Sequence, residues 1–140
     1  MDKWPYLAQE DFHIRQHIAA YYMRDLSRVV EIGPHLSPVK PHLADGVEYI
    51  PVSKGEQITP VAPYGLVALG LGLEGGLEYV AGLAQRAQVV VLEWATEYKP
   101  GAEQAERIMR GLEQLKVLTM SIPKSGGEYA HRTLVALRGA

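Results

Sequence analysis

Short apolar runs recur along this chain, and they constrain its fold more than any other feature of the sequence. They lie at residues 27–33, 46–53, 64–74 and 88–94. Their valine- and leucine-rich sequences lack the polar alternation of a half-exposed strand, which is typical of strands covered on both faces. Segments with helical spacing of apolar residues predict helices at residues 7–24, 77–87 and 102–116. This order predicts an α/β fold, a three-layer sandwich around a mostly parallel twisted sheet.

The last two apolar runs predict a different pairing. Residues 117–123 and 131–138 are separated by only seven residues, "KSGGEYA". A parallel connection needs a crossover of about a dozen residues or more. We therefore expect these two strands to form a C-terminal antiparallel β-hairpin at or near one edge of the sheet.

Packing expectations follow from the same patterns. The N-terminal helix should bury a stripe of five apolar residues, and a short helix should follow Ser37 as its cap, with Pro38 first and Pro41 limiting its length. The stripe is Leu7, Ile14, Ile18, Tyr21 and Tyr22. The predicted core comprises Val29, Val30, Ile32, Leu66, Val67, Val89, Val90, Val91, Ile108, Leu112, Leu118 and Leu134.

Composition excludes several classes of protein. The 140 residues suggest a single domain, 1–140, with residues 1–25 as an N-terminal helix region. A net charge of −2 gives no indication of a nucleic-acid partner, and the absence of cysteine excludes disulfides and thiolate metal sites. No run approaches the roughly 18 apolar residues of a membrane span, so we expect a cytoplasmic protein without a membrane partner.

The stretch "RVVEIGPHLSP" joins the first strand to a turn that could bind a ligand. With the order of elements and the terminal hairpin, its "VVEIG" resembles the class I S-adenosylmethionine (SAM)-dependent methyltransferases, a Rossmann-like family. That family ends its first strand in acid-x-Gly-x-Gly-x-Gly. Glu31 and Gly33 match, whereas His35 and Ser37 occupy the next two glycine positions. The resemblance implies cofactor-binding positions at Glu31, Gly33, His35, Ser37, Gly70 and Glu74, with SAM as the possible cofactor and weak or absent binding.

A second departure concerns the ribose of the cofactor. The family places an acid at the end of its second strand, but this sequence has Pro51 or Val52 there, and Glu48 falls inside the strand. The ten residues 54–63 also leave no room for the helix that usually follows. The sequence is thus similar to a shortened methyltransferase with an altered cofactor site.

Individual residues keep alternative interpretations open. Glu31 either lies beside a cofactor or caps backbone N–H groups of the next turn, and Glu74 could cap a helix. Histidines at 35 and 42 could act as general bases. His13 and His17 have zinc-like spacing but no matching acid motif, so no metal site is predicted.

The end of the 88–94 strand allows two further interpretations. Glu93, Trp94 and Glu97 could hold a cationic or aromatic substrate, although packing of Trp94 over the sheet is favoured.

Two functions remain possible at this stage. The chain is either a small SAM-dependent methyltransferase of unknown catalytic residues and substrate, or a non-catalytic methyltransferase-like domain that binds a protein or another small ligand. The sequence leaves enzymatic activity undecided. A homodimer or a protein partner is plausible, because the shortened 54–63 region leaves one side of the sheet thinly covered.

Overall fold

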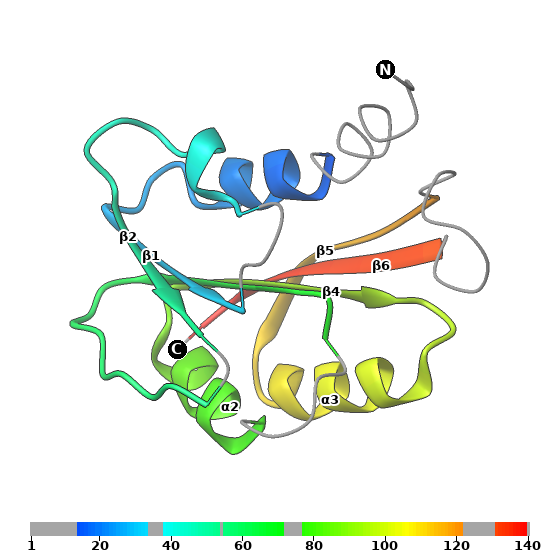
Figure 1. Cartoon of the computed structure of the whole chain (residues 1–140). Helices are drawn as coiled ribbons and strands as arrows, with labels where there is room; N and C mark the ends of the chain where they lie inside the picture. The colour runs from blue at the N-terminus through cyan, green and yellow to red at the C-terminus, as the bar shows by residue number, and fades with distance from the viewer. Residues whose placement is uncertain (1–13, 34–37, 54, 72–76, 122–130, 140) are drawn as a thin grey trace.

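The computed structural model describes residues 14–33, 38–53, 55–71, 77–121 and 131–139. These residues form a six-stranded sheet with the order β2-β1-β3-β4-β6-β5 (Figure 1). The strands are β1 Arg28–Ile32, β2 Glu48–Val52, β3 Gly65–Leu69, β4 Val89–Ala95, β5 Glu113–Ser121 and β6 His131–Arg138. The helices are the 3-10 helix η1 Lys40–His42, α2 Leu77–Arg86 and α3 Lys99–Met109, together with an N-terminal helix at 14–22.

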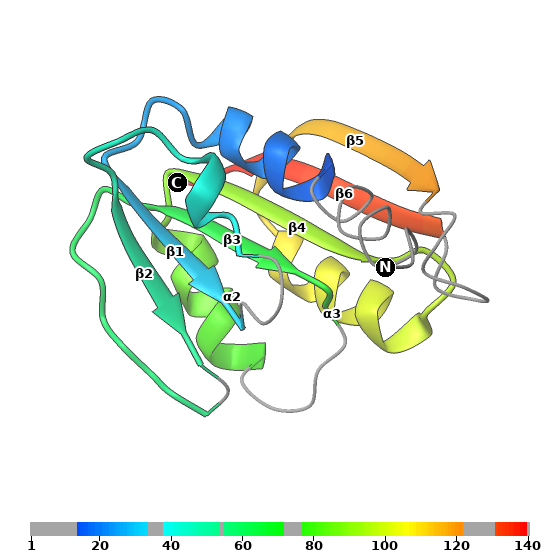
Figure 2. The ribbon, with the colours of Figure 1, turned by 45° about the horizontal axis from the view of Figure 1, so that its top comes forward.

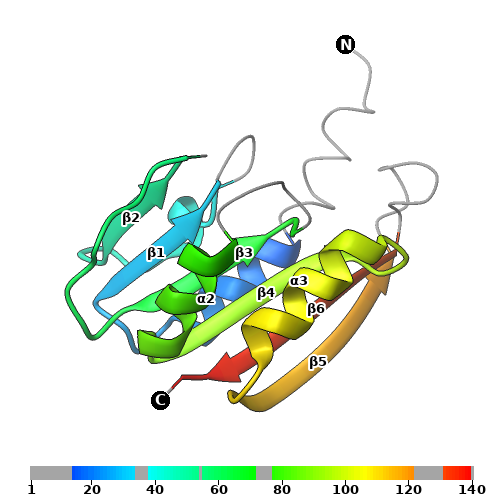
Figure 3. The same ribbon diagram turned by 90° about the horizontal axis from the view of Figure 1, so that it is seen from below.

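The helices cover both faces of the sheet. The N-terminal helix and η1 lie on one face, and α2 and α3 lie on the other (Figures 1 and 3). The strands β2, β1, β3 and β4 run parallel, while β6 is antiparallel to both β4 and β5. The three-layer α/β prediction and the terminal antiparallel pair are both confirmed, and β5 forms the outer edge.

Two apolar clusters hold the layers together. One joins the sheet to α2 and α3 around Leu66, Val90 and Ile108, and the other joins it to the N-terminal helix around Met23, Val67 and Val91. Eight predicted core residues are buried: Val29, Val30, Leu66, Val67, Val90, Val91, Ile108 and Leu134. Ile32, Val89, Leu112 and Leu118 are only half-buried because they lie toward strand ends or toward the outer edge.

The predicted stripe of the N-terminal helix is wrong for its exposed members and holds in part for Ile18 and Tyr22, which pack against the apolar cluster on that face of the sheet. Ile14 and Tyr21 are 50% and 57% exposed, and Ile18 and Tyr22 are half-buried. Leu7 lies outside the described residues. The helix instead buries Arg15, Gln16, Ala19, Ala20 and Met23. Small alanines allow the helix to approach the sheet closely, and the buried arginine has a carboxylate partner on β4.

The predicted helix at 102–116 is also wrong at both ends. It begins at Lys99 and ends at Met109, and residues from Glu113 onward form β5. Gly111 has a φ of 82°, a conformation that favours glycine and terminates a helix. The leucines at 112 and 115 are three positions apart, which fits a helix face, so their spacing extended the predicted helix beyond this boundary.

Two smaller predictions need correction. The short helix begins at Lys40 after Val39, with Pro41 in its first turn, and not at Pro38; Ser37 lies outside the described residues. The strand predicted at 64–74 occupies only Gly65–Leu69.

Candidate functional site

The carboxyl ends of the four parallel strands meet at one edge of the sheet (Figure 2). Strand β1 pairs with β2 on one side and with β3 on the other. The connections therefore diverge at β1, and such a switch point is where open α/β sheets bind ligands. The candidate site lies beyond Ile32, Val52, Leu69 and Ala95, where these strands end.

Two glycines turn the chain at this edge. Gly33 has a φ of 60° and Gly70 a φ of 77°, a region that side chains other than glycine rarely adopt. The Gly33 N–H donates to the carbonyl of Val52 at 2.8 Å, which ties the end of β1 to the end of β2. Both glycines that the sequence singled out thus lie on neighbouring parallel strands, where backbone is open to close approach.

Glu31 is engaged by its own chain. Its side chain is buried, and Oε1 accepts hydrogen bonds from the Val39 N–H at 2.9 Å and the Tyr49 hydroxyl at 2.6 Å. Desolvation by burial raises the pKa of Glu31, and these hydrogen bonds act against the rise. Burial and the neighbouring carboxylate also raise the pKa of Tyr49. The capping interpretation of Glu31 is confirmed, with Val39 as the backbone donor.

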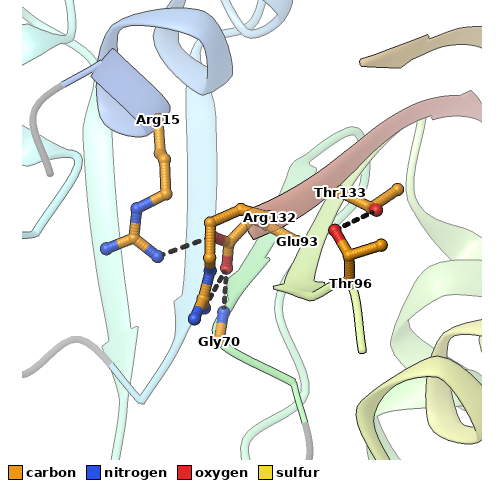
Figure 4. Close-up of polar contacts among 6 residues, drawn as sticks. All are labelled: Arg15, Gly70, Glu93, Thr96, Arg132 and Thr133. Atoms are coloured by element: carbon orange, nitrogen blue, oxygen red, sulfur yellow. Dashed lines mark hydrogen bonds and ion pairs between the residues drawn. The ribbon is translucent and has the colours of Figure 1, made fainter. Parts of the chain in front are cut away.

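A second buried carboxylate, Glu93, gathers a polar network at the end of β4 (Figure 4). Its oxygens accept from Arg15 Nη1 at 2.8 Å, from Arg132 Nε and Nη2 at 2.6 and 2.9 Å, and from the Gly70 N–H at 2.7 Å. The three side chains come from the N-terminal helix, β4 and β6. Beside them, the hydroxyls of Thr96 and Thr133 are 2.8 Å apart.

Two guanidinium groups meet one carboxylate in this network, so the charge of Glu93 is paired while the network keeps one positive charge in excess. Burial of Glu93 favours its neutral form, but hydrogen bonds and charge from Arg132 and Arg15 lower its pKa overall. Glu93 is therefore ionised at neutral pH and already has its donors. It does not offer a free carboxylate to a cationic substrate.

Strand β2 does not itself end in a carboxylate, and the first carboxylate beyond it in sequence is that of Glu56. Val52 is buried, Pro51 is exposed, and the Ser53 N–H donates to Glu56 Oε1 at 3.0 Å. Glu48 is the first residue of β2 and lies at the opposite end of that strand, where its Oε1 accepts from Arg28 Nε at 2.7 Å.

The structure gives a different outcome for each of the remaining candidate residues. Trp94 packs in the apolar cluster beneath α2 and α3, as favoured, and Glu97 is exposed. The rings of His17 and His42 are in contact, with centroids 4.1 Å apart. Within the described part of the chain, no three metal-ligating side chains gather. The positions of His13, His35, Ser37 and Glu74 fall outside the described residues.

Sequence reasoning missed both arginines of the network. A signal existed, because Glu93 interrupts the apolar run "VVVLEWA" and a buried carboxylate requires donors. The hairpin prediction placed Arg132 on a strand next to that run. The spacing Arg15–Ala19–Met23 follows one helix face, but a charged residue was not expected there.

A small apolar cavity adjoins Gly70 and the end of β1 on the side of α2 and α3. Its volume is about 50 Å³, and its walls include Ile32, Leu71, Val80, Gln104 and Ile108. The cavity is smaller than the roughly 300 Å³ of an ordinary small-molecule pocket.

Comparison with known proteins identifies the fold. The structure is similar to the N-methyltransferase NodS from Bradyrhizobium japonicum WM9, with a TM-score of 0.66 and 9% identity over 94% of this chain and 96% of that one. It is similar to a TehB-like SAM-dependent methyltransferase from Corynebacterium glutamicum, with a TM-score of 0.51 and 11% identity over 90% and 88% of the two chains. A human methyltransferase 10 domain containing protein matches with a TM-score of 0.50 and 12% identity, over 99% and 83%. No family model matches the sequence, and a search of curated proteins gives no match.

The chain therefore has the class I methyltransferase-like fold, as its sequence indicated. Its sheet order, its terminal antiparallel pair and its edge of turning glycines define this class together with the matched structures. Among the described helices, none is long and apolar enough to cross a membrane.

Proposed function

We propose that this protein is a methyltransferase-fold domain with an altered cofactor site that binds SAM weakly or not at all. The proposal rests on one observation above the others: the end of β2 presents a buried valine, Val52, where the resemblance implies an acid for the ribose hydroxyls, and the first carboxylate beyond it, that of Glu56, already accepts from the Ser53 N–H. A charge-assisted hydrogen bond is worth about 1.5–3 kcal/mol. Its loss alone lowers affinity by roughly one to two orders of magnitude.

The turn after β1 adds a second loss. The sequence has His35 and Ser37 where the resembling family has glycines that accept positive φ. Forcing another residue into that region costs about 1–3 kcal/mol each. Together these costs remove most of a micromolar affinity of about −8 kcal/mol and leave a dissociation constant weaker than roughly 100 µM.

An active methyltransferase is the second candidate, and one specific observation favours it. Gly33 and Gly70 have positive φ at adjacent strand ends, the glycine conformation that is used where backbone approaches a ligand closely. Methyl transfer depends mainly on holding a nucleophile in line with the methyl group, and it needs no strong catalytic signature.

Calorimetric titration with SAM and with S-adenosylhomocysteine separates the two candidates. We expect a dissociation constant weaker than roughly 100 µM for the unmodified protein. The double variant His35→Gly with Ser37→Gly, combined with Ser53→Asp at the exposed end of β2, should bind more tightly because it restores the glycines and an acid. Glu97→Asp is a matched control, since that exposed carboxylate follows β4 and not β2. Micromolar binding by the unmodified protein would favour the enzyme.

A further inference from the structure

Strand β5 forms an open edge of the sheet. Within the described part of the chain, the sheet order ends at β5, and β6 is its neighbour (Figure 3). Most of its nine residues are exposed, including Leu115 at 37% and Val117 at 49%. An edge strand presents a row of backbone N–H and C=O groups that can pair with another strand.

The two edge strands, β2 and β5, differ in the features that hinder pairing with another strand. Strand β2 has five residues, includes Pro51, which has no N–H to donate, and begins with the charged Glu48. Strand β5 contains no proline or glycine, and its sequence "EQLKVLTMS" has one charge of each sign. Its register with β6 shifts between Gln114 and Lys116, so the regular stretch open to pairing begins at Lys116. The loop beyond β2 is tied to α2, because the Tyr79 hydroxyl bonds both the N–H and the carbonyl of Ile58. Of the two edge strands, β5 is therefore the one more open to pairing with another strand.

We propose that β5 pairs antiparallel with β5 of a second copy, so that the sheet continues across a twofold-symmetric dimer. From Lys116 onward the strand is regular. Its residues 117 and 119 oppose Val135 and Thr133 of β6 on the α3 face, and Leu118 opposes Leu134 on the other face. A twofold axis perpendicular to the sheet keeps each face of the sheet on the same side. The α3 face of one copy therefore continues into the α3 face of the second copy.

The charge pattern of β5 suits pairing with itself. A twofold axis at Val117 places it opposite the partner's Val117, and Lys116 opposite the partner's Leu118. An axis at Leu118 places Val117 opposite the partner's Thr119, and Lys116 opposite the partner's Met120. Neither arrangement sets like charges opposite each other, and β-branched pairs of this kind stabilise a sheet. A second copy supplies a matching strand without any other protein.

A charge-swap experiment at Val117 tests this dimer. Val117→Glu and Val117→Lys each place like charges about 5–8 Å apart across the twofold axis in either arrangement. By sedimentation equilibrium, we expect the unmodified protein to dimerise with increasing concentration and each variant to dissociate at least tenfold more readily. An equimolar mixture of the two variants should recover the dimer, because the charges are then opposite.

Controls separate pairing from damage to the fold. Val61→Glu changes an apolar side chain that is 70% exposed in the loop between β2 and β3, and it should leave the dimer unchanged. Circular dichroism checks that each variant is folded, and the shorter Val117→Asp replaces Val117→Glu if that variant is not. A monomeric unmodified protein at about 1 mM, dimers unaffected by the single charges, or a mixture that stays monomeric would each overturn the proposal.

Discussion

Removal of the Glu93 carboxylate should strongly destabilise the protein. The side chain of Glu93 is 0% exposed, and those of Arg15 and Arg132 are 8% and 13% exposed. Glu93→Ala leaves two nearly buried guanidinium groups without this counter-ion. Breaking a buried ion pair by removing one partner costs about 3–5 kcal/mol. The Gly70 N–H adds little to this cost, because it also bonds the backbone carbonyl of residue 93 at 2.9 Å.

Urea unfolding at about pH 7 measures this loss. Glu93→Gln, which keeps the shape but not the charge, should lose about 1–3 kcal/mol. Glu97→Gln changes an exposed carboxylate four residues later and should stay within about 0.5 kcal/mol of the unmodified protein. Replacing all three charged residues by methionine should recover much of the Glu93→Ala loss, because apolar side chains of similar volume often substitute for a buried ionic group.

The pH dependence supplies a second readout. Because the pKa of Glu93 is lowered in the folded protein, its ionisation stabilises the fold above the ordinary value of 4.5, and this contribution is lost as the pH falls through the folded pKa. Glu31 has a raised pKa and contributes with the opposite sign. The difference between the unmodified protein and Glu93→Gln isolates Glu93, and it should shrink below pH 4.5. A Glu93→Ala loss under about 1 kcal/mol, with no dependence on pH, would refute the buried network.

Two further substitutions test the packing of each layer. Val90→Asp, at 0% exposure in the central sheet, should prevent stable folding because an unpaired buried charge costs several kcal/mol, and a cooperative melting curve would contradict this. Gly65→Ala should cost about 1–3 kcal/mol, because a Cβ there would overlap the side chains of Met23 and Leu26. Gly82→Ala, in α2 with open space around it, is the control and should stabilise by about 0.5–1 kcal/mol; equal effects of the two glycine changes would argue against the packing of the N-terminal helix.

The fold was predictable where one physical constraint dominated. The apolar runs without alternation required coverage on both faces, and the seven-residue link required an antiparallel pair. The boundary near Gly111 was not predictable from spacing, because Leu112 and Leu115 continue the helical period although they lie beyond the helix. Its position depends on the pairing of β5 with β6, which is a long-range contact.

The candidate site was predictable only in part. Glu31, Gly33 and Gly70 were found from local pattern, and the structure places all three at the carboxyl edge of neighbouring strands. Arg15 escaped because apolar spacing on its helix pointed to the opposite face. An arginine can be buried in the core when a carboxylate pairs with it. Here that carboxylate belongs to Glu93, 78 positions away in the sequence, so local spacing did not indicate the burial of Arg15.

Residue-resolved titration with SAM tests the altered cofactor site most directly. Backbone amide signals of Gly33 and Gly70, the two turning glycines, report any ligand at this edge of the sheet by NMR. We expect their shifts to remain far from saturation at about 100 µM SAM, since the proposed dissociation constant is weaker than that. Saturation of both signals at about 10 µM SAM or below would contradict the account and establish an intact cofactor site.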